Sequence, residues 1–130
     1  MKLFAQIVAL LCLPALVAAQ TSTPSPTKPL SVATLLRHAN ALKGQRVEVR
    51  AYLRIQFEGN AFCEDFKRGP CVRFTYDSGP WENESDMRRY DSKHEYWSRL
   101  SGKRVTVSGR FLPGKAGYPG DFYDPELLAK

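Results

Sequence analysis

Histidine and cysteine, which supply most zinc ligands in proteins, are scarce in this sequence. Its 130 residues include 2 histidines and 3 cysteines. His38 and His94 are isolated, with no second histidine or cysteine nearby in the sequence. Structural zinc sites instead use four ligands at short, characteristic spacings. The sequence therefore predicts no metal centre, and we expect no cofactor.

Motifs that would indicate catalysis are also lacking. There is no glycine-rich phosphate loop, and neither histidine lies in a motif that would pair it with a serine nucleophile. A nucleophile needs such a base, itself oriented by a third group. Acidic residues cluster at 82–95 and at 121–126 without the regular oxygen spacing of a calcium loop. We therefore expect a protein that is not an enzyme, and a hydrolase is the third alternative behind two binding roles.

A long apolar run occurs at the N-terminus. Lys2 precedes an almost wholly apolar stretch, residues 3–17, and small or medium residues at 17–19 resemble a cleavage site. The run is shorter than the roughly 20 residues of a membrane-spanning helix. Residues 1–19 are therefore predicted to be a cleaved signal peptide, and the product to be exported (periplasmic or secreted) with no transmembrane span after cleavage. An uncleaved anchor is the alternative.

Beyond the signal peptide the composition changes twice. Residues 20–29 are rich in Pro, Ser and Thr and are typical of a linker, while residues 30–130 suffice for one domain. Helical spacing of apolar residues predicts a helix that is capped by Ser31 and ended by Gly44. Strict alternation over 46–56 predicts a strand, and shorter apolar runs predict strands at 61–63, 71–76 and 104–112.

The second half of the domain is predicted to begin with a long loop, residues 77–91. Ser92 and Glu95 have the spacing of a capping box, which predicts that a second helix starts there. Trp81, in the loop, is expected to be buried in the core. The last segment, 120–128, contains Pro125 and is a poor strand. The predicted fold is therefore mainly β with two short helices, in which five strands form a small, partly open barrel.

Two similar phrases open strands in this chain. Gly-Gln-Arg-Val-Glu-Val stands at 44–49, and Gly-Lys-Arg-Val-Thr-Val-Ser-Gly stands at 102–109. These phrases, and a helix between the third and fourth strands, resemble bacterial exported OB-fold domains. The resemblance covers roughly residues 31–128. It implies a five-stranded OB barrel and a binding function, since such domains bind oligonucleotides, oligosaccharides or proteins.

Cys63 and Cys71 are the cysteines that lie beyond the predicted signal peptide. Cys63 ends one predicted strand and Cys71 begins the next. Each alternates with an apolar neighbour, Phe62 or Val72, and so points to the opposite side of the sheet from it. An exported protein is exposed to oxidising conditions, which favour disulfides. Because both cysteines point to the same side of the predicted hairpin, we expect a cross-strand disulfide between them.

Basic residues concentrate on the outward side of the predicted sheet. The formal net charge is +6, which favours acidic partners. Arginines with an interleaved aromatic residue suit a polyanion or a stacked ligand. The candidate ligand-binding residues are Arg50, Tyr52, Arg54, Arg73, Lys67 and Arg68.

The partner of this basic surface is predicted to be an anionic ligand or an envelope protein, because export argues against intracellular nucleic acid. Two alternatives stay open. The surface is an ordinary solvated sheet face, on which arginine stems cover apolar area. Or the domain is an assembly factor that contacts an envelope protein through Trp81, Tyr90 or the 77–91 segment.

Overall fold

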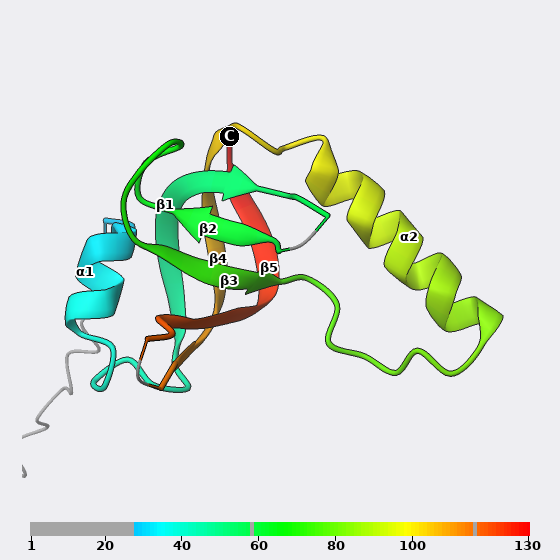
Figure 1. Ribbon diagram of the computed structural model, residues 1–130, viewed down its shortest axis with the longest axis horizontal. Coiled ribbons are helices and arrows are strands. Elements are labelled where there is room, and N and C mark those ends of the chain that lie inside the picture. Colours follow the sequence, from blue (N-terminus) through cyan, green and yellow to red (C-terminus); the bar gives the residue numbers. More distant parts are fainter. Residues whose placement is uncertain (1–27, 58, 116) are drawn as a thin grey trace, which may run out of the picture.

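The computed structural model describes residues 28–57, 59–115 and 117–130, so the predicted signal peptide and most of the predicted linker lie outside the described residues. The elements follow one another as α1 (Val32–Arg37), β1 (Arg46–Arg54), β2 (Ala61–Cys63), β3 (Cys71–Thr75), α2 (Glu84–Ser98), β4 (Arg104–Pro113) and β5 (Gly120–Ala129). The prediction of a mainly β fold with five strands and two helices is confirmed (Figure 1).

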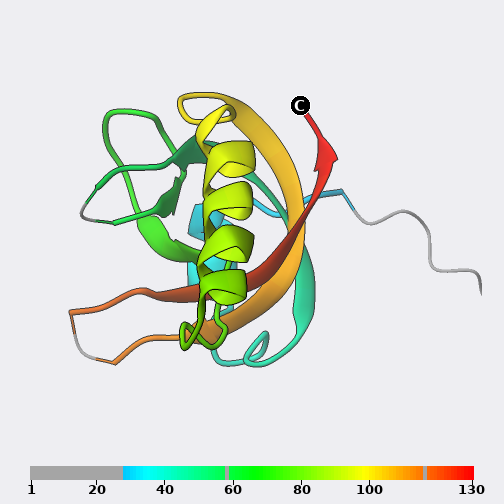
Figure 2. The same ribbon diagram turned by 90° about the vertical axis from the view of Figure 1, so that its right-hand side faces the viewer.

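The five strands form one sheet that closes into a ring. Its order is β1-β2-β3-β5-β4, and β4 returns to β1. β3 and β5 run parallel, whereas the other neighbouring strands are antiparallel. The two helices flank the ring on opposite sides, and Figure 2 shows α2 in front of it. Within the described residues, neither helix is both long and apolar enough to cross a membrane.

The predicted small barrel is present, and β5 closes its ring although Pro125 makes that segment a poor strand by its sequence. β5 pairs with β3 on one side and with β4 on the other. Pro125 lies where the β4–β5 register is irregular, between the pairs Arg110–Tyr123 and Ser108–Glu126. Asp124, just before it, has a φ of 49°. A bulge takes residues out of the ladder, and the proline is therefore accommodated without breaking the strand.

The interior of the ring is apolar, as the alternation in β1 predicted. Val49, Ala51 and Leu53 of that strand are buried. Their partners in the core are Phe62, Val72, Phe74, Val105, Val107, Phe111 and Phe122 from the other strands, with Val32, Leu35, Trp97 and Leu100 from and beside the helices. The ring of Trp97 packs edge-on against Phe74, with 4.9 Å between centroids. The side chains from and beside the helices therefore cover the two ends of the ring.

The start of α2 differs from the prediction. Its N-cap is Asn83, whose Oδ1 accepts a hydrogen bond from the Asp86 N–H at 3.0 Å. Asp86 Oδ2 in turn accepts from the Glu82 N–H at 3.0 Å. This reciprocal cap begins the helix inside the segment predicted to be a loop, and Ser92 lies in mid-helix. The first helix is also shorter than predicted, since α1 ends at Arg37 and turns follow up to Gly44.

The disulfide prediction is confirmed. Cys63 and Cys71 are direct cross-strand partners in the β2–β3 register, and their sulfurs are bonded. The bridge lies on the outer side of the sheet, opposite the buried Phe62 and Val72. It therefore fixes the hairpin on the same side of the sheet as the predicted binding face.

Candidate functional site

The outer side of β1 carries the first of the predicted site residues. Arg50, Tyr52 and Arg54 alternate there with the buried positions of the strand. Arg54 lies opposite Ala61 of β2, and Ala61 lies opposite Arg73 of β3. Arg54 and Arg73 therefore belong to one row across three strands, as the alternation predicted.

Tyr52 is in contact with two neighbouring side chains. Phe66, from the β2–β3 loop, lies edge-on to its ring at a centroid distance of 6.3 Å. The guanidinium of Arg104, the register partner of Tyr52 on β4, lies 5.9 Å from the ring centroid. Tyr52 is consequently half-buried and supports Arg104, which leaves only part of its ring for stacking with a ligand.

Arg73 and Arg54 are each engaged with the protein. Arg73 Nε forms an ion pair with Asp121 on β5, and this hydrogen bond raises the pKa of Arg73 above its ordinary value. Its guanidinium also lies 5.3 Å from the ring centroid of Tyr118. Arg54 Nη2 lies 3.8 Å from Cys71 Sγ, so its side chain packs against the disulfide. Of these two arginines, Arg73 therefore has its charge balanced by a carboxylate.

Lys67 and Arg68 belong to the β2–β3 loop. The loop turn is held by the Lys67 N–H, which donates to Asp65 Oδ1 at 3.0 Å. Both basic side chains are exposed, and they take part in none of the ion pairs among the described residues. They add positive charge beside the face without belonging to its strand rows.

A pocket that the sequence did not reveal lies beside Arg50. It has a volume of about 250 Å³ and is lined by Lys28, Pro29, Leu30, Ser31, Arg50 and Arg104. Lys28 lies in the segment that the sequence predicts to be a linker, and nothing in the sequence indicates that Arg104 lies beside the first strand. One signal pointed to Arg104: its alternation with the buried Val105 places it on the outer side of β4.

A second hollow lies between the β1–β2 turn and α2. It has a volume of about 410 Å³, and Asn60, Arg73, Tyr90 and His94 contribute to its lining. His94 Nδ1 lies 2.6 Å from the Tyr76 hydroxyl, and His94 Nε2 lies 3.3 Å from Ser98 Oγ. Because a phenol rather than a carboxylate faces Nδ1, the pair resembles an activated serine–histidine couple only in spacing.

The phenol itself is held neutral. Burial raises the pKa of Tyr76 well above its ordinary value, and the hydrogen bond with Tyr90 adds to this effect. The two hydroxyls are 3.4 Å apart. The Tyr90 ring also stacks on His94, with centroids 5.9 Å apart. This cluster packs α2 against the end of β3.

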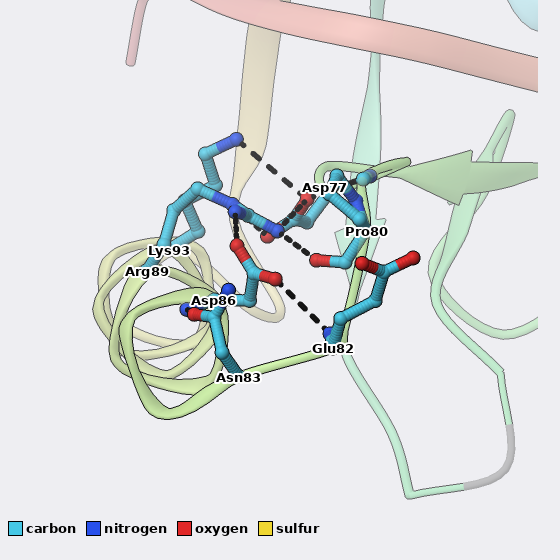
Figure 3. A network of polar contacts seen from close by, with 8 residues as sticks. Asp77, Pro80, Glu82, Asn83, Asp86, Arg89 and Lys93 are labelled. Atoms are coloured by element: carbon cyan, nitrogen blue, oxygen red, sulfur yellow. Dashed lines mark hydrogen bonds and ion pairs between the residues drawn. The ribbon is translucent and has the colours of Figure 1, made fainter.

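A network of charged groups fastens the start of α2 (Figure 3). Arg89 Nε donates to Asp77 Oδ2 at 3.0 Å, and its Nη1 donates to Asp86 Oδ1 at 2.7 Å. Arg89 Nη2 also donates to the Pro80 carbonyl oxygen at 2.8 Å, and Lys93 Nζ lies 4.0 Å from Asp77. These charges satisfy one another, so the network is an anchor for the helix.

Trp81 is exposed, and the prediction that it is buried is wrong. Its exposed fraction is 62 %, and its ring lies edge-on to Tyr90 at 5.5 Å between centroids. With Met87 and Tyr90 it lines an apolar pocket of about 270 Å³. The chain passes here outside the ring, ahead of α2, and it is Trp97 that occupies the interior.

No group of three or more His, Cys, Asp or Glu side chains that could hold a metal ion occurs in residues 28–57, 59–115 and 117–130.

Comparison with known proteins assigns no family to this chain. No family model matches it, and no curated protein matches it. Among solved structures, it is similar to part of "Structure of RecG bound to three-way DNA junction", with a TM-score of 0.49 and 15 % sequence identity. That match covers 79 % of this chain and 13 % of the other, so this chain spans a small part of that protein's length.

Proposed function

We propose that the chain is an exported, OB-like binding module without enzymatic activity. Its ligand is an anionic molecule or an anionic component of the cell envelope, held on the outer side of β1 and the strands beside it. One observation supports this proposal most strongly. Arg50, Arg54 and Arg104 share this surface, and none of them takes part in the ion pairs among the described residues.

The contrast with the other arginines strengthens the argument. The arginines that are paired with carboxylates are Arg46, Arg73, Arg88, Arg89, Arg99 and Arg110. Among the described residues, the arginines outside these ion pairs are Arg50 and Arg54 on β1, Arg104 beside them on β4, and Arg37 and Arg68 elsewhere. Three of these five therefore lie together on the proposed face. Guanidinium groups bind carboxylates and phosphates in a fixed, two-pronged geometry, and strands hold them more rigidly than loops do.

The test is a double substitution, Arg50→Gln with Arg54→Gln. Binding to a sulfated polysaccharide such as heparin is measured over a series of salt concentrations. We expect affinity at low salt to fall at least about tenfold, and its dependence on salt to become shallower, because two cations leave the interface.

The matched control is Arg88→Gln with Arg99→Gln. It removes the same charge from α2, where each arginine is paired with a glutamate one turn away. Affinity in this control should stay within about twofold of the unsubstituted protein. An equal loss in both variants would mean that net charge alone attracts the polyanion, and the proposed face would then be wrong.

The second candidate function is an assembly factor that binds an envelope protein. The exposed pocket of Trp81, Met87 and Tyr90 favours it, because apolar aromatic surface outside a core is typical of protein interfaces. Cross-linking in the native envelope separates the two candidates. A partner that is lost with Trp81→Ala and kept with the arginine pair substituted supports the assembly factor.

A further inference from the structure

We propose that the pocket formed by Lys28, Arg50 and Arg104 binds a single tetrahedral oxyanion, a phosphate or sulfate group that is free or terminal on a larger ligand. We call it the oxyanion pocket; its lining also includes Pro29, Leu30 and Ser31. The inference rests on the proposed function and deepens it, because it names the group that is recognised and the residues that recognise it.

Three separate segments bring these cations together. Lys28 precedes α1, Arg50 lies on β1, and Arg104 begins β4. The first segment is held against β1 by two backbone hydrogen bonds: the Leu30 N–H donates to the Glu48 carbonyl oxygen, and the Arg50 N–H donates to the Leu30 carbonyl oxygen, both at 2.8 Å. The pocket is therefore part of the folded domain.

Both guanidinium groups are oriented before any ligand arrives. Arg50 Nη1 donates to Thr106 Oγ1 at 2.9 Å, and Thr106 is buried on β4. Arg104 lies over the ring of Tyr52. Each contact leaves further N–H donors of the guanidinium free to meet an anion. A ligand that binds such fixed side chains loses less conformational entropy on binding than one that must order them.

The electrostatics of the pocket favour an anion. Its lining contains three cations and no carboxylate. Glu48, two positions before Arg50 on the same side of the strand, lines an adjoining hollow together with Arg46, and Lys28 and Leu30 line both hollows. A doubly charged phosphate has several acceptor oxygens and can meet donors from three directions, whereas a carboxylate has two oxygens in one plane.

The size of the pocket and the state of its hydroxyl group also bear on the ligand. A volume of about 250 Å³ has room for one such group and for part of the molecule that bears it. Ser31 Oγ is already engaged, since it accepts from the Thr34 N–H at 3.1 Å and donates to Thr34 Oγ1 at 2.9 Å. Recognition therefore depends on the charged side chains and not on that hydroxyl.

The experiment titrates inorganic phosphate and, separately, sulfate into the protein while NMR follows the amide signals. We expect saturable shifts at residues 28, 50 and 104, and a dissociation constant of about 1 mM, the scale of a few charge-assisted hydrogen bonds. Arg104→Gln should weaken this binding at least about tenfold. Arg104→Lys keeps the charge but loses the planar guanidinium group, so its affinity should lie between those of the unsubstituted protein and Arg104→Gln.

The matched control is Arg110→Gln, on the same strand but paired with Asp124. It should leave the titration unchanged. An equal effect of Arg110→Gln, or no saturable shifts at residues 28, 50 and 104, would overturn the oxyanion pocket. A protein that still binds heparin through Arg50 and Arg54 but does not titrate with phosphate keeps the proposed function and loses this inference. Saturable phosphate binding without any heparin binding keeps this inference and loses the proposed function.

The source of the oxyanion is resolved with two further probes, glucose 6-phosphate and vesicles of phosphatidylcholine with 20 % phosphatidic acid. Binding of the sugar phosphate that Arg104→Gln abolishes supports a soluble or glycan ligand. Binding of the anionic vesicles that Arg104→Gln abolishes, with pure phosphatidylcholine vesicles inert, supports a lipid headgroup. Binding of either probe that is unaffected by Arg104→Gln counts against the pocket.

Discussion

At the scale of single residues, Asp77 is a buried carboxylate between β3 and α2. Only 2 % of its side chain is exposed. Burial alone would raise the pKa of this carboxyl group. The hydrogen bonds from Arg89 and from the Gly79 N–H, and the charges of Lys93 and Arg89, outweigh that effect, and the pKa of Asp77 lies below its ordinary value. The folded protein therefore holds this carboxylate more firmly ionised than the unfolded chain does.

This depressed pKa predicts a dependence of stability on pH. A group whose pKa is lower in the folded state stabilises the fold above its unfolded pKa, about 3.9, and loses that contribution as the pH falls through its folded pKa. Asp77→Asn should cost about 2 kcal/mol at pH 7, because a charged hydrogen bond is lost, and should flatten the loss of stability below about pH 4. Urea unfolding at pH 7 and at pH 3 measures both effects.

Asp91→Asn is the control for Asp77→Asn, since Asp91 is exposed on α2. It should leave the free energy of unfolding at pH 7 within about 0.5 kcal/mol of the parent, as surface substitutions do. If Asp77→Asn keeps the full acid sensitivity of the parent protein, the ion pair with Arg89 is not its source.

The outward arginines show what the sequence could and could not predict at this scale. Alternation along β1 correctly predicted that Arg50 and Arg54 share one side of the strand, since a strand turns every second residue the same way. It could not predict that Phe66 contacts Tyr52, or that Trp81 is exposed. The positions of Phe66 and Trp81 depend on how a loop and a helix pack against the folded sheet. Local sequence patterns do not predict such packing.

At the scale of elements, two competing signals mark the start of α2. Ser92 and Glu95 have the spacing of a capping box. Asn83 and Asp86 have the same spacing, with the shorter aspartate in place of glutamate. The structure uses the second pair, because a start at Asn83 allows Arg89 to reach both Asp77 and Asp86. A tertiary contact thus selects between two local possibilities.

The two caps give opposite predictions. Asn83→Ala should destabilise the protein by about 1 kcal/mol, because the Asp86 N–H loses its partner. Ser92→Ala should be neutral or slightly stabilising, since alanine is the better helix former in mid-helix. Thermal or urea unfolding of both variants makes the comparison. The reverse order of effects would place the helix start at Ser92 instead.

The strands also differ in how far their sequence reveals them. β1 is bounded and oriented by its own alternation, and the Cys63–Cys71 pairing follows from the facing of two short runs. Pro125 makes β5 a poor strand by its sequence alone. The segment is nevertheless a strand, because a bulge in its pairing with β4 accommodates the proline, and that pairing is a tertiary contact.

At the scale of the whole molecule, closure of the ring joins segments far apart in the chain. β3 and β5 are parallel neighbours, with Phe74 opposite Phe122. Phe122 is fully buried and its ring lies against Phe62, at 5.6 Å between centroids. The closing strand is therefore held by core packing as well as by its two ladders, and such long-range pairing lies beyond local sequence patterns.

Closure requires a glycine at position 109 of β4. A Cβ atom added there would lie 2.2 Å from Cε1 of Phe122, well inside van der Waals contact. Because Phe122 is fully buried and packs against Phe62 and Phe74, Gly109→Ala should destabilise the protein by about 3 kcal/mol, the upper part of the range for overpacked cores. The free energy of urea unfolding measures this loss.

A double-substitution cycle tests whether this loss arises from the contact with Phe122. Phe122→Leu removes the ring atoms that the new methyl group would strike, at its own cost in packing. In that background Gly109→Ala should cost less than about 1 kcal/mol, so the two changes should be strongly non-additive. Simple additivity would mean that the loss comes from the β4 backbone, and that ring closure does not depend on the fit between Gly109 and Phe122.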